Sequence, residues 1–127
     1  MGQYLIDTNV ISYYFSGSLP ERGMQFIDSV VDTVPHLSVI SQIELLCWKT
    51  DSDNEQKIKG FIGDSVILDI TQDIILYCVS IRRNKKIKTP DAIIAATALS
   101  HGYTLITNNE KDFSNIRSLK IVNPFTI

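Results

Sequence analysis

The chain has 127 residues, of which 44% are hydrophobic, and a formal net charge of −2. This length suffices for one domain with a buried core and is too short for two ordinary ones, so we expect a single domain over residues 1–127. No apolar run approaches the ~18 residues of a membrane span, and the acidic balance argues against a protein that binds nucleic acid through overall basicity.

Nothing at the start of the chain resembles a basic leader or a small-residue cleavage site, which favours a cytoplasmic protein without membrane attachment. Cys47 and Cys78 lie far apart within apolar helical patterns, and we interpret them as buried, reduced thiols. Together with His36 and His101 they offer the residue types of a zinc site. No Cys-x-x-Cys or His-x-x-x-His spacing supports such a site.

The first part of the chain predicts a strand followed by two helices. Residues 4–6 form an apolar run that ends on Asp7, helical spacing follows over 8–15, and an amphipathic helix is expected over 21–33. Its inward face should comprise Met24, Ile27, Val30, Val31 and Val34. Asp7 thus stands at the carboxyl end of a strand, where parallel sheets bind ligands, although Asp is also a good helix N-cap.

Glu44 allows two interpretations. A second strand is expected at 37–40 and a helix from Ser41, so Ser41-x-x-Glu44 has the pattern of a capping box, in which the glutamate folds back on the helix start. A residue in the first turn after a strand also faces the carboxyl-end edge of a parallel sheet. Glu44 can therefore be a cap or a member of a site.

The middle of the chain leads into a basic segment. A polar turn over 50–54, a short helix over 55–62, a strand over 65–70 and a helix capped by Thr71 are expected. The helix ends in a run whose cations are Arg82, Arg83, Lys85, Lys86 and Lys88. Each of them taken singly is best explained as a solvated charge. As a cluster they are a candidate phosphate contact.

The helix that follows the basic segment has the clearest start signal of the chain. Thr89 is the expected N-cap, Pro90 suits the first helical position, and Asp91 lies in the first turn, at the positive end of the helix dipole. Four alanines in its body let the helix pack closely against a sheet. Gly102 is the expected C-cap, and strands are expected over 103–107 and 119–122.

Alternating strands and helices predict an α/β fold, a three-layer α/β/α sandwich with a mostly parallel central sheet. Right-handed crossovers place the joints between strands and following helices on one edge. Asp7, Glu44 and the segment after Thr107 should meet there, and Asp91 joins them if its helix begins at the same edge.

Several carboxylates at one edge repel one another, and a divalent cation removes that repulsion. Ligands that are all oxygen suit Mg²⁺ or Mn²⁺ and exclude a thiolate or imidazole zinc site. A basic cluster beside such a metal suits a polyanion. The predicted chemistry is therefore hydrolysis of a phosphodiester by metal-activated water.

Four segments of the chain resemble the motifs of PIN domains, and most closely those of VapC-type toxins of bacterial toxin–antitoxin pairs. They are residues 4–9 (YLIDTN), 41–45 (SQIEL), 89–98 (TPDAIIAATA) and 107–113 (TNNEKDF). The four occur in the right order and cover nearly the whole chain. The resemblance implies a PIN-like fold and an endoribonuclease that cleaves single-stranded RNA, such as a tRNA or rRNA loop. It also implies a homodimer inhibited by a cognate antitoxin.

The resemblance implies roles for individual residues. Asp7, Asp91 and Glu44 correspond to the acidic metal-binding residues, and Thr8 and Asn9 are nearby hydrogen-bonding groups that support substrate binding. The family's fourth acidic position falls on Asn109. Asp112 lies one helical turn further on and belongs with the candidate catalytic residues, so either Asn109 weakens the metal site or Asp112 substitutes for the missing acid.

A second hypothesis, motivated by Asn109, is a catalytically silent PIN-like module that binds RNA or a protein. A haloacid-dehalogenase-type phosphatase would need an aspartate where Asn9 stands, and a dinucleotide-binding domain would need a glycine-rich turn after the first strand. The aromatic residues Tyr13, Tyr14, Phe15 and Trp48 are more numerous than two short helices need. Together they favour an interface, although core packing is the simpler explanation for each one singly.

Overall fold

A computed structural model describes residues 3–127, and its centre is a five-stranded sheet in the order β3-β2-β1-β4-β5 in which every neighbouring pair is parallel. The strands are β1 (Tyr4–Ile6), β2 (His36–Ser38), β3 (Val66–Leu68), β4 (Thr104–Ile106) and β5 (Ile121–Val122). The helices are α1 (Thr8–Ser16), α2 (Glu21–Asp32), α3 (Val39–Cys47), α4 (Ser52–Gly63), α5 (Gln72–Asn84), α6 (Thr89–His101) and α7 (Glu110–Phe113). The predicted α/β class is confirmed.

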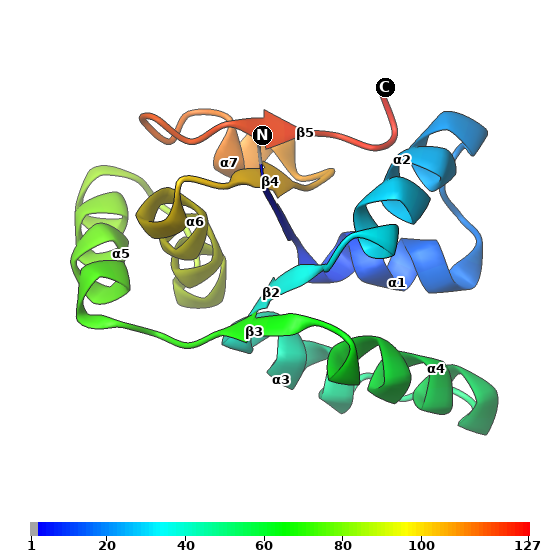
Figure 1. Ribbon diagram of the computed structural model, residues 1–127. Helices are drawn as coiled ribbons and strands as arrows, with labels where there is room; N and C mark the ends of the chain where they lie inside the picture. Colours follow the sequence, from blue (N-terminus) through cyan, green and yellow to red (C-terminus); the bar gives the residue numbers. More distant parts are fainter. Residues whose placement is uncertain (1–2) are drawn as a thin grey trace.

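Helices cover both faces of the sheet. Neighbouring residues of a strand point to opposite faces, and Leu5 accordingly joins one buried cluster with residues of α5 and α6, whereas Ile6 joins a second with residues of α1, α2 and α4. Figure 1 shows α5 and α6 together on one side of the sheet and α1, α2 and α4 on the other. The predicted three-layer sandwich is therefore confirmed.

The order in which successive strands are added to the sheet changes direction between β1 and β4. From β1 it proceeds to β2 and β3 on one side, and β4 and β5 fill the other side. The carboxyl ends of β1 and β4 are neighbours, joined by a 2.9 Å hydrogen bond that Asp7 N donates to Ile106 O. Such a switch point leaves a crevice at the carboxyl ends of the strands. It is the expected place for a ligand site.

The start of α3 differs from the prediction. The helix begins at Val39, because Ser38 is the N-cap and its side chain accepts a 3.1 Å hydrogen bond from Ile40 N. The strand expected over 37–40 is consequently only His36–Ser38, and Ser41 lies inside the helix. The capping-box interpretation of Ser41 and Glu44 is wrong, since Ser38 already satisfies the helix start.

The predicted starts of two other helices also need correction. Lys88, without a side-chain cap, occupies the N-cap position of α6, and Thr89 is already helical, so Thr89 is not the cap. The expected polar turn over 50–54 is largely the first turn of α4, because the Asp51 side chain accepts a hydrogen bond from Asn54 N. Gly102, in contrast, is the predicted left-handed C-cap of α6, with φ +69°.

Three predictions about buried side chains can be compared with the structure. Val34 is 50% exposed, contrary to the prediction, because α2 ends at Asp32 and the chain has left the helix before Val34. Cys47 is exposed and Cys78 partly buried, so the prediction of buried thiols is wrong for Cys47, although both are free. Tyr13, Tyr14, Phe15 and Trp48 all pack against the buried cluster beneath α1, α2 and α4, which confirms core packing for each of them.

No helix among residues 3–127 is long and apolar enough to cross a membrane.

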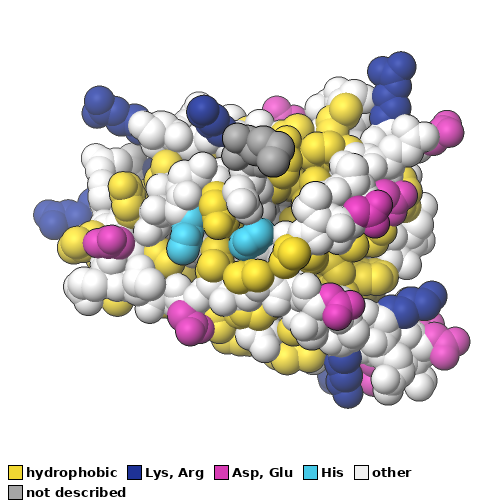
Figure 2. Space-filling model, in the orientation of Figure 1, with side chains coloured by type: hydrophobic (Ala, Val, Ile, Leu, Met, Phe, Trp, Pro, Cys, Tyr) yellow, Lys and Arg dark blue, Asp and Glu magenta, His cyan; other side chains and the backbone are white. Residues whose placement is uncertain are grey.

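On the face shown in Figure 2 two histidine side chains lie close together. The rings of His36 and His101 pack against that of Tyr103, with centroids 5.2 Å and 5.4 Å away. His36 begins β2 and Tyr103 precedes β4, so this face lies at the amino ends of the strands, opposite the switch-point edge.

Candidate active site at the carboxyl ends of β1 and β4

Asp7 is the most tightly held side chain at the switch point. It follows β1, is only 5% exposed, and is the N-cap of α1. Its Oδ1 accepts a 2.9 Å hydrogen bond from Thr8 N, and its Oδ2 accepts a 2.8 Å hydrogen bond from Thr107 Oγ1. The two interpretations of Asp7 are thus compatible, because the capping bond occupies one oxygen while the other faces the edge shared with β4.

The environment of Asp7 makes its charge costly. Its pKa is raised to about 6, chiefly by burial and also by the charges of Asp91 and Glu44, whereas the hydrogen bonds from Thr107 and Thr8 oppose the rise. A buried carboxylate with two like-charged neighbours is the kind of group found at functional sites.

Glu44 reaches from α3 across to the start of α1. Its side chain is exposed, and Thr8 Oγ1 lies 2.6 Å from its Oε1 and 2.8 Å from Ser41 Oγ, within hydrogen-bond distance of both. Ser41 itself is fully buried. Thr8 therefore links the residue after Asp7 to α3, which explains how a helix elsewhere in the chain directs a carboxylate toward the switch point.

Asp91 joins this edge from the first turn of α6. The carboxyl is partly buried, and burial raises its pKa, as do the charges of Asp112 and Glu44, while Lys88 lowers it. Helix α6 thus begins at the same edge as α1 and α3, which was the condition attached to Asp91 in the sequence. The carboxylates of Asp7, Glu44, Asp91 and Asp112 share one electrostatic environment.

Asn109 and Asp112, which the sequence offered as alternatives for the fourth acidic position, are hydrogen-bonded to each other. Asn109 is the N-cap of α7, its Oδ1 accepting a 3.3 Å hydrogen bond from Asp112 N. Its Nδ2 donates a 2.9 Å hydrogen bond to Asp112 Oδ2. The amide that stands at the fourth acidic position thereby fixes the carboxylate that lies one turn further on.

Thr107 is the functional residue that the sequence reasoning did not single out. Its hydroxyl donates to Asp7 Oδ2 and accepts a 3.0 Å hydrogen bond from Asn109 N, so it connects the ends of β1 and β4. It is fully buried. The available signal was its position, since Thr107 follows β4 as Asp7 follows β1.

The structure distributes the other predicted substrate contacts over different places. Arg82 donates from Nε to Ile87 O at 3.1 Å and thus holds the turn between α5 and α6. Lys88 lies near enough to Asp91 to lower its pKa. Asn9, Arg83 and Lys86 are exposed, and Lys85 is partly buried. Of the basic cluster, Lys88 is the member whose charge acts on the carboxylates.

The donor set fits a hard divalent cation chemically, since it offers only carboxylate oxygens, whose negative charges raise the pKa of Asp7 and of Asp91. Among residues 3–127, however, no three His, Cys, Asp or Glu side chains are grouped closely enough to hold a metal ion. The carboxylates therefore share an edge and a field without forming a closed coordination sphere.

Fold and site together define a three-layer α/β domain with an acidic site at the switch point of a parallel sheet. The sequence model of the PIN domain matches residues 4–119, and the chain belongs to this family. The predicted resemblance is thus confirmed. The carboxylates described above occupy the segments on which that resemblance was based.

Two solved structures are similar to this chain over nearly its whole length, and one of them is described as a toxin–antitoxin complex. A toxin–antitoxin complex from Klebsiella pneumoniae contains a chain 33% identical to this one, with a TM-score of 0.80 over 98% of this chain and 100% of that one. VapBC2 from Rickettsia felis, solved with a DNA fragment from its promoter, is 25% identical, with a TM-score of 0.79 over 94% of this chain and 97% of that one.

A shorter match concerns Ribonuclease VapC1 from Rickettsia felis, 53% identical over 36 residues. It covers 28% of this chain and 27% of that protein. The local identity is high, but the matched segment spans about a quarter of either protein.

Proposed function

We propose that this protein is a metal-dependent endoribonuclease that cleaves single-stranded RNA, such as a tRNA or rRNA loop, and acts as the toxin of a type II toxin–antitoxin pair. The observation that carries the proposal is the shared acidic edge, where Asp7, Glu44 and Asp91 come from distant segments. Neighbouring carboxylate charges there raise the pKa of Asp7 and of Asp91. Membership of the PIN family and the similarity to Ribonuclease VapC1 support the choice of nuclease.

Mg²⁺ or Mn²⁺ is the proposed cofactor, held by Asp7, Asp91 and Glu44. A divalent cation bound there supplies an acidified water for attack and stabilises negative charge on phosphate oxygens. The chain's own contribution is positioning: Thr107 and the Thr8 amide fix both oxygens of Asp7, while the Thr8 hydroxyl orients Glu44.

Asp112 is proposed as the fourth carboxylate of the site, with Asn109 as its positioning residue. Two observations support this division of roles. The charge of Asp112 raises the pKa of Asp91, and Asn109 binds both the backbone N–H and the carboxylate of Asp112. Asn109 thus keeps the acidic edge ordered without adding a further negative charge to it.

RNA contact is proposed to begin at Lys88, the cation whose charge acts on Asp91, and to include Thr8, Asn9 and the neighbouring cations of the basic segment. A cation beside the carboxylates attracts a phosphodiester that the acidic edge alone would repel. The partner that inhibits the enzyme is proposed to be a cognate antitoxin, since the similar solved structures are toxin–antitoxin complexes.

Cleavage of RNA by the purified protein with and without EDTA tests the proposal. Asp7→Asn and Asp91→Asn are each expected to reduce cleavage in Mg²⁺ by about 100-fold, because each removes a metal-binding charge. Asp64→Asn is the matched control, since Asp64 is an exposed C-cap of α4. Cleavage that persists in EDTA, or that both site variants retain, would contradict the assignment.

The second candidate is a catalytically silent module that binds RNA or a protein. Asn109 favours it, as does the lack of a closed group of three metal-binding side chains within residues 3–127. Titration with Mn²⁺, followed by calorimetry, separates the two candidates. Saturable binding that Asp91→Asn abolishes supports the nuclease, and no binding at millimolar Mn²⁺ supports the silent module.

A further inference from the structure

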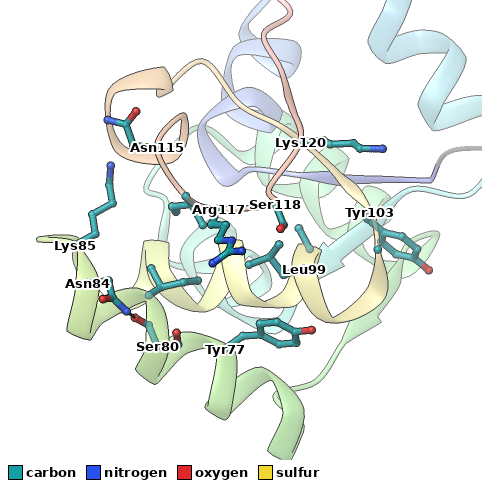
Figure 3. Close-up of a pocket in the computed structure, with 14 residues that line it drawn as sticks. Tyr77, Ser80, Asn84, Lys85, Leu99, Tyr103, Asn115, Arg117, Ser118 and Lys120 are labelled. Atoms are coloured by element: carbon teal, nitrogen blue, oxygen red, sulfur yellow. Dashed lines mark hydrogen bonds between the residues drawn. The ribbon is translucent and has the colours of Figure 1, made fainter.

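A second concave site lies on the α5–α6 side of the molecule. It is a groove of about 710 Å³, within the size range of ligand sites, between α5, the second half of α6 and the segment 115–120 that precedes β5. Figure 3 shows its lining residues, with Arg117 extending from that segment over α6 beside Leu99. None of the four carboxylates of the candidate active site lines it.

The groove has a charge opposite to that of the protein as a whole. Lys85, Arg117 and Lys120 line it, and no Asp or Glu does, although the chain carries a net charge of −2. A concave surface whose charged side chains are all positive raises the local concentration of anions. The charge distribution therefore indicates an anionic ligand.

The uncharged lining side chains narrow down the kind of anion. Ser80, Asn84, Asn115 and Ser118 supply hydroxyl and amide groups for phosphate and ribose oxygens. Tyr77 is 44% exposed, and exposed aromatic side chains stack on unpaired bases. Cations, small polar donors and an exposed aromatic ring together match single-stranded nucleic acid better than an apolar ligand.

The position of the groove connects it with the acidic edge. Tyr103 and Lys120 precede β4 and β5 and thus lie toward the amino ends of the strands, whereas Lys85 lies three residues before Lys88, the cation that acts on Asp91. Helix α6 joins these two regions over about 20 Å. A single-stranded nucleic acid bound in the groove can therefore extend along α6 to the carboxylates of the acidic edge.

We propose that this groove binds single-stranded RNA through its phosphate backbone, as an exosite outside the acidic edge that holds the part of the substrate distant from the cleaved bond. This inference rests on the proposed ribonuclease function. Arg117 and Lys120 bind the phosphates, and Tyr77 stacks on a base.

The test compares two double variants that change the net charge equally. Arg117→Glu with Lys120→Glu alters the groove, and Arg22→Glu with Lys57→Glu alters exposed positions on α2 and α4. Fluorescence anisotropy in EDTA measures binding of a labelled RNA of about 12 nucleotides, which is in the range of known single-strand sites. The groove variant is expected to bind roughly ten-fold more weakly, with a salt slope smaller by about 1 to 2. Circular dichroism establishes that both variants fold.

Each remaining outcome decides the inference. If both double variants bound RNA equally more weakly, the loss would be explained by net charge alone, and the proposed exosite would be contradicted. Displacement of the RNA by uridine 5′-monophosphate as readily as by unlabelled RNA would assign the groove to a free nucleotide and also overturn it. Failure of the proposed ribonuclease function is detected separately, because RNA cleavage would then be unaffected by Asp7→Asn.

Discussion

Asp7 combines a structural and a chemical position in one residue. Its carboxylate caps α1 through the Thr8 amide and also bonds to Thr107 at the end of β4. Since the side chain is almost fully buried, its ionised form is stabilised by these two bonds and destabilised by lost hydration and by its acidic neighbours. The ionised form of Asp7 therefore lowers the stability of the folded protein, a cost that the proposed cation would offset.

The raised pKa has a definite sign for stability. The folded protein holds a proton on Asp7 up to about pH 6, whereas the unfolded chain releases it near its usual pKa of 3.8. The free energy of unfolding therefore falls as the pH rises from about 4 to about 6, and the loss is at most about 3 kcal/mol above that range.

Asp7→Asn is expected to remove this pH-dependent loss, because the amide cannot ionise. In EDTA at about pH 7 the variant should be more stable than the wild type by about 1–2 kcal/mol, and the difference should shrink toward pH 4. Urea denaturation at several pH values measures it, with Asp64→Asn as the exposed control. If the free energy of unfolding had the same pH dependence in the wild type and in Asp7→Asn, ionisation of Asp7 would not destabilise the folded protein, contrary to this prediction.

At the level of elements, α2 is fixed by the segment that follows β5. A Cβ atom at Gly23 would clash with the carbonyl of Pro124, so a hydrogen at this position allows the helix and the C-terminal segment to touch. Phe125, next in the chain, packs edge-on against Tyr13 of α1, with ring centroids 5.2 Å apart. The C-terminal segment thus holds both helices of this layer in place.

Two glycine substitutions in helices are expected to act in opposite directions. Gly23→Ala should destabilise the protein by about 1–3 kcal/mol, because the backbone of the C-terminal segment has to move away. Gly60→Ala in α4 should stabilise it by about 0.5–1 kcal/mol, since nothing lies within 4 Å of the added Cβ. Thermal denaturation measures both. Equal effects of the two substitutions would show that helix propensity alone decides them.

At the level of the whole molecule, α3 and α5 expose large apolar side chains. Their exposed fractions reach 61% for Leu76 and 53% for Ile43, and Leu46, Ile75 and Val79 are also exposed. Exposed apolar residues gathered on helices commonly mark an interface. We propose that a second copy of this chain covers them, which is the homodimer implied by the resemblance to VapC-type toxins.

Leu76→Lys is expected to convert the dimer into a monomer, because it places a charge in a desolvated apolar contact. Sedimentation velocity measures the change. Val34→Lys is the matched control, since Val34 is 50% exposed but lies between α2 and β2. A wild-type protein that is monomeric at micromolar concentration would contradict the proposal.

Much of the architecture could be predicted from the sequence, because its signals are local. Apolar runs and helical spacing gave the order of strands and helices, and Gly102 marked the end of α6. Errors arose where two nearby residues could serve the same purpose. Ser38 and Ser41 are both possible caps for α3, and burial of Ser41 against Thr8, which is remote in sequence, decides between them.

The sequence by itself determined the fold class and predicted that Asp7 and Glu44 meet at one edge, since the handedness of parallel crossovers leaves few alternatives. Whether Asp91 joins them depended on where α6 begins, which the sequence left open. Only the tertiary structure decided how these side chains are held. The bonds from Thr8 to Glu44 and from Thr107 to Asp7 join residues 36 and 100 positions apart, and the groove of Arg117 and Lys120 arises between three segments. Such partners are set by packing, which no local pattern in the chain encodes.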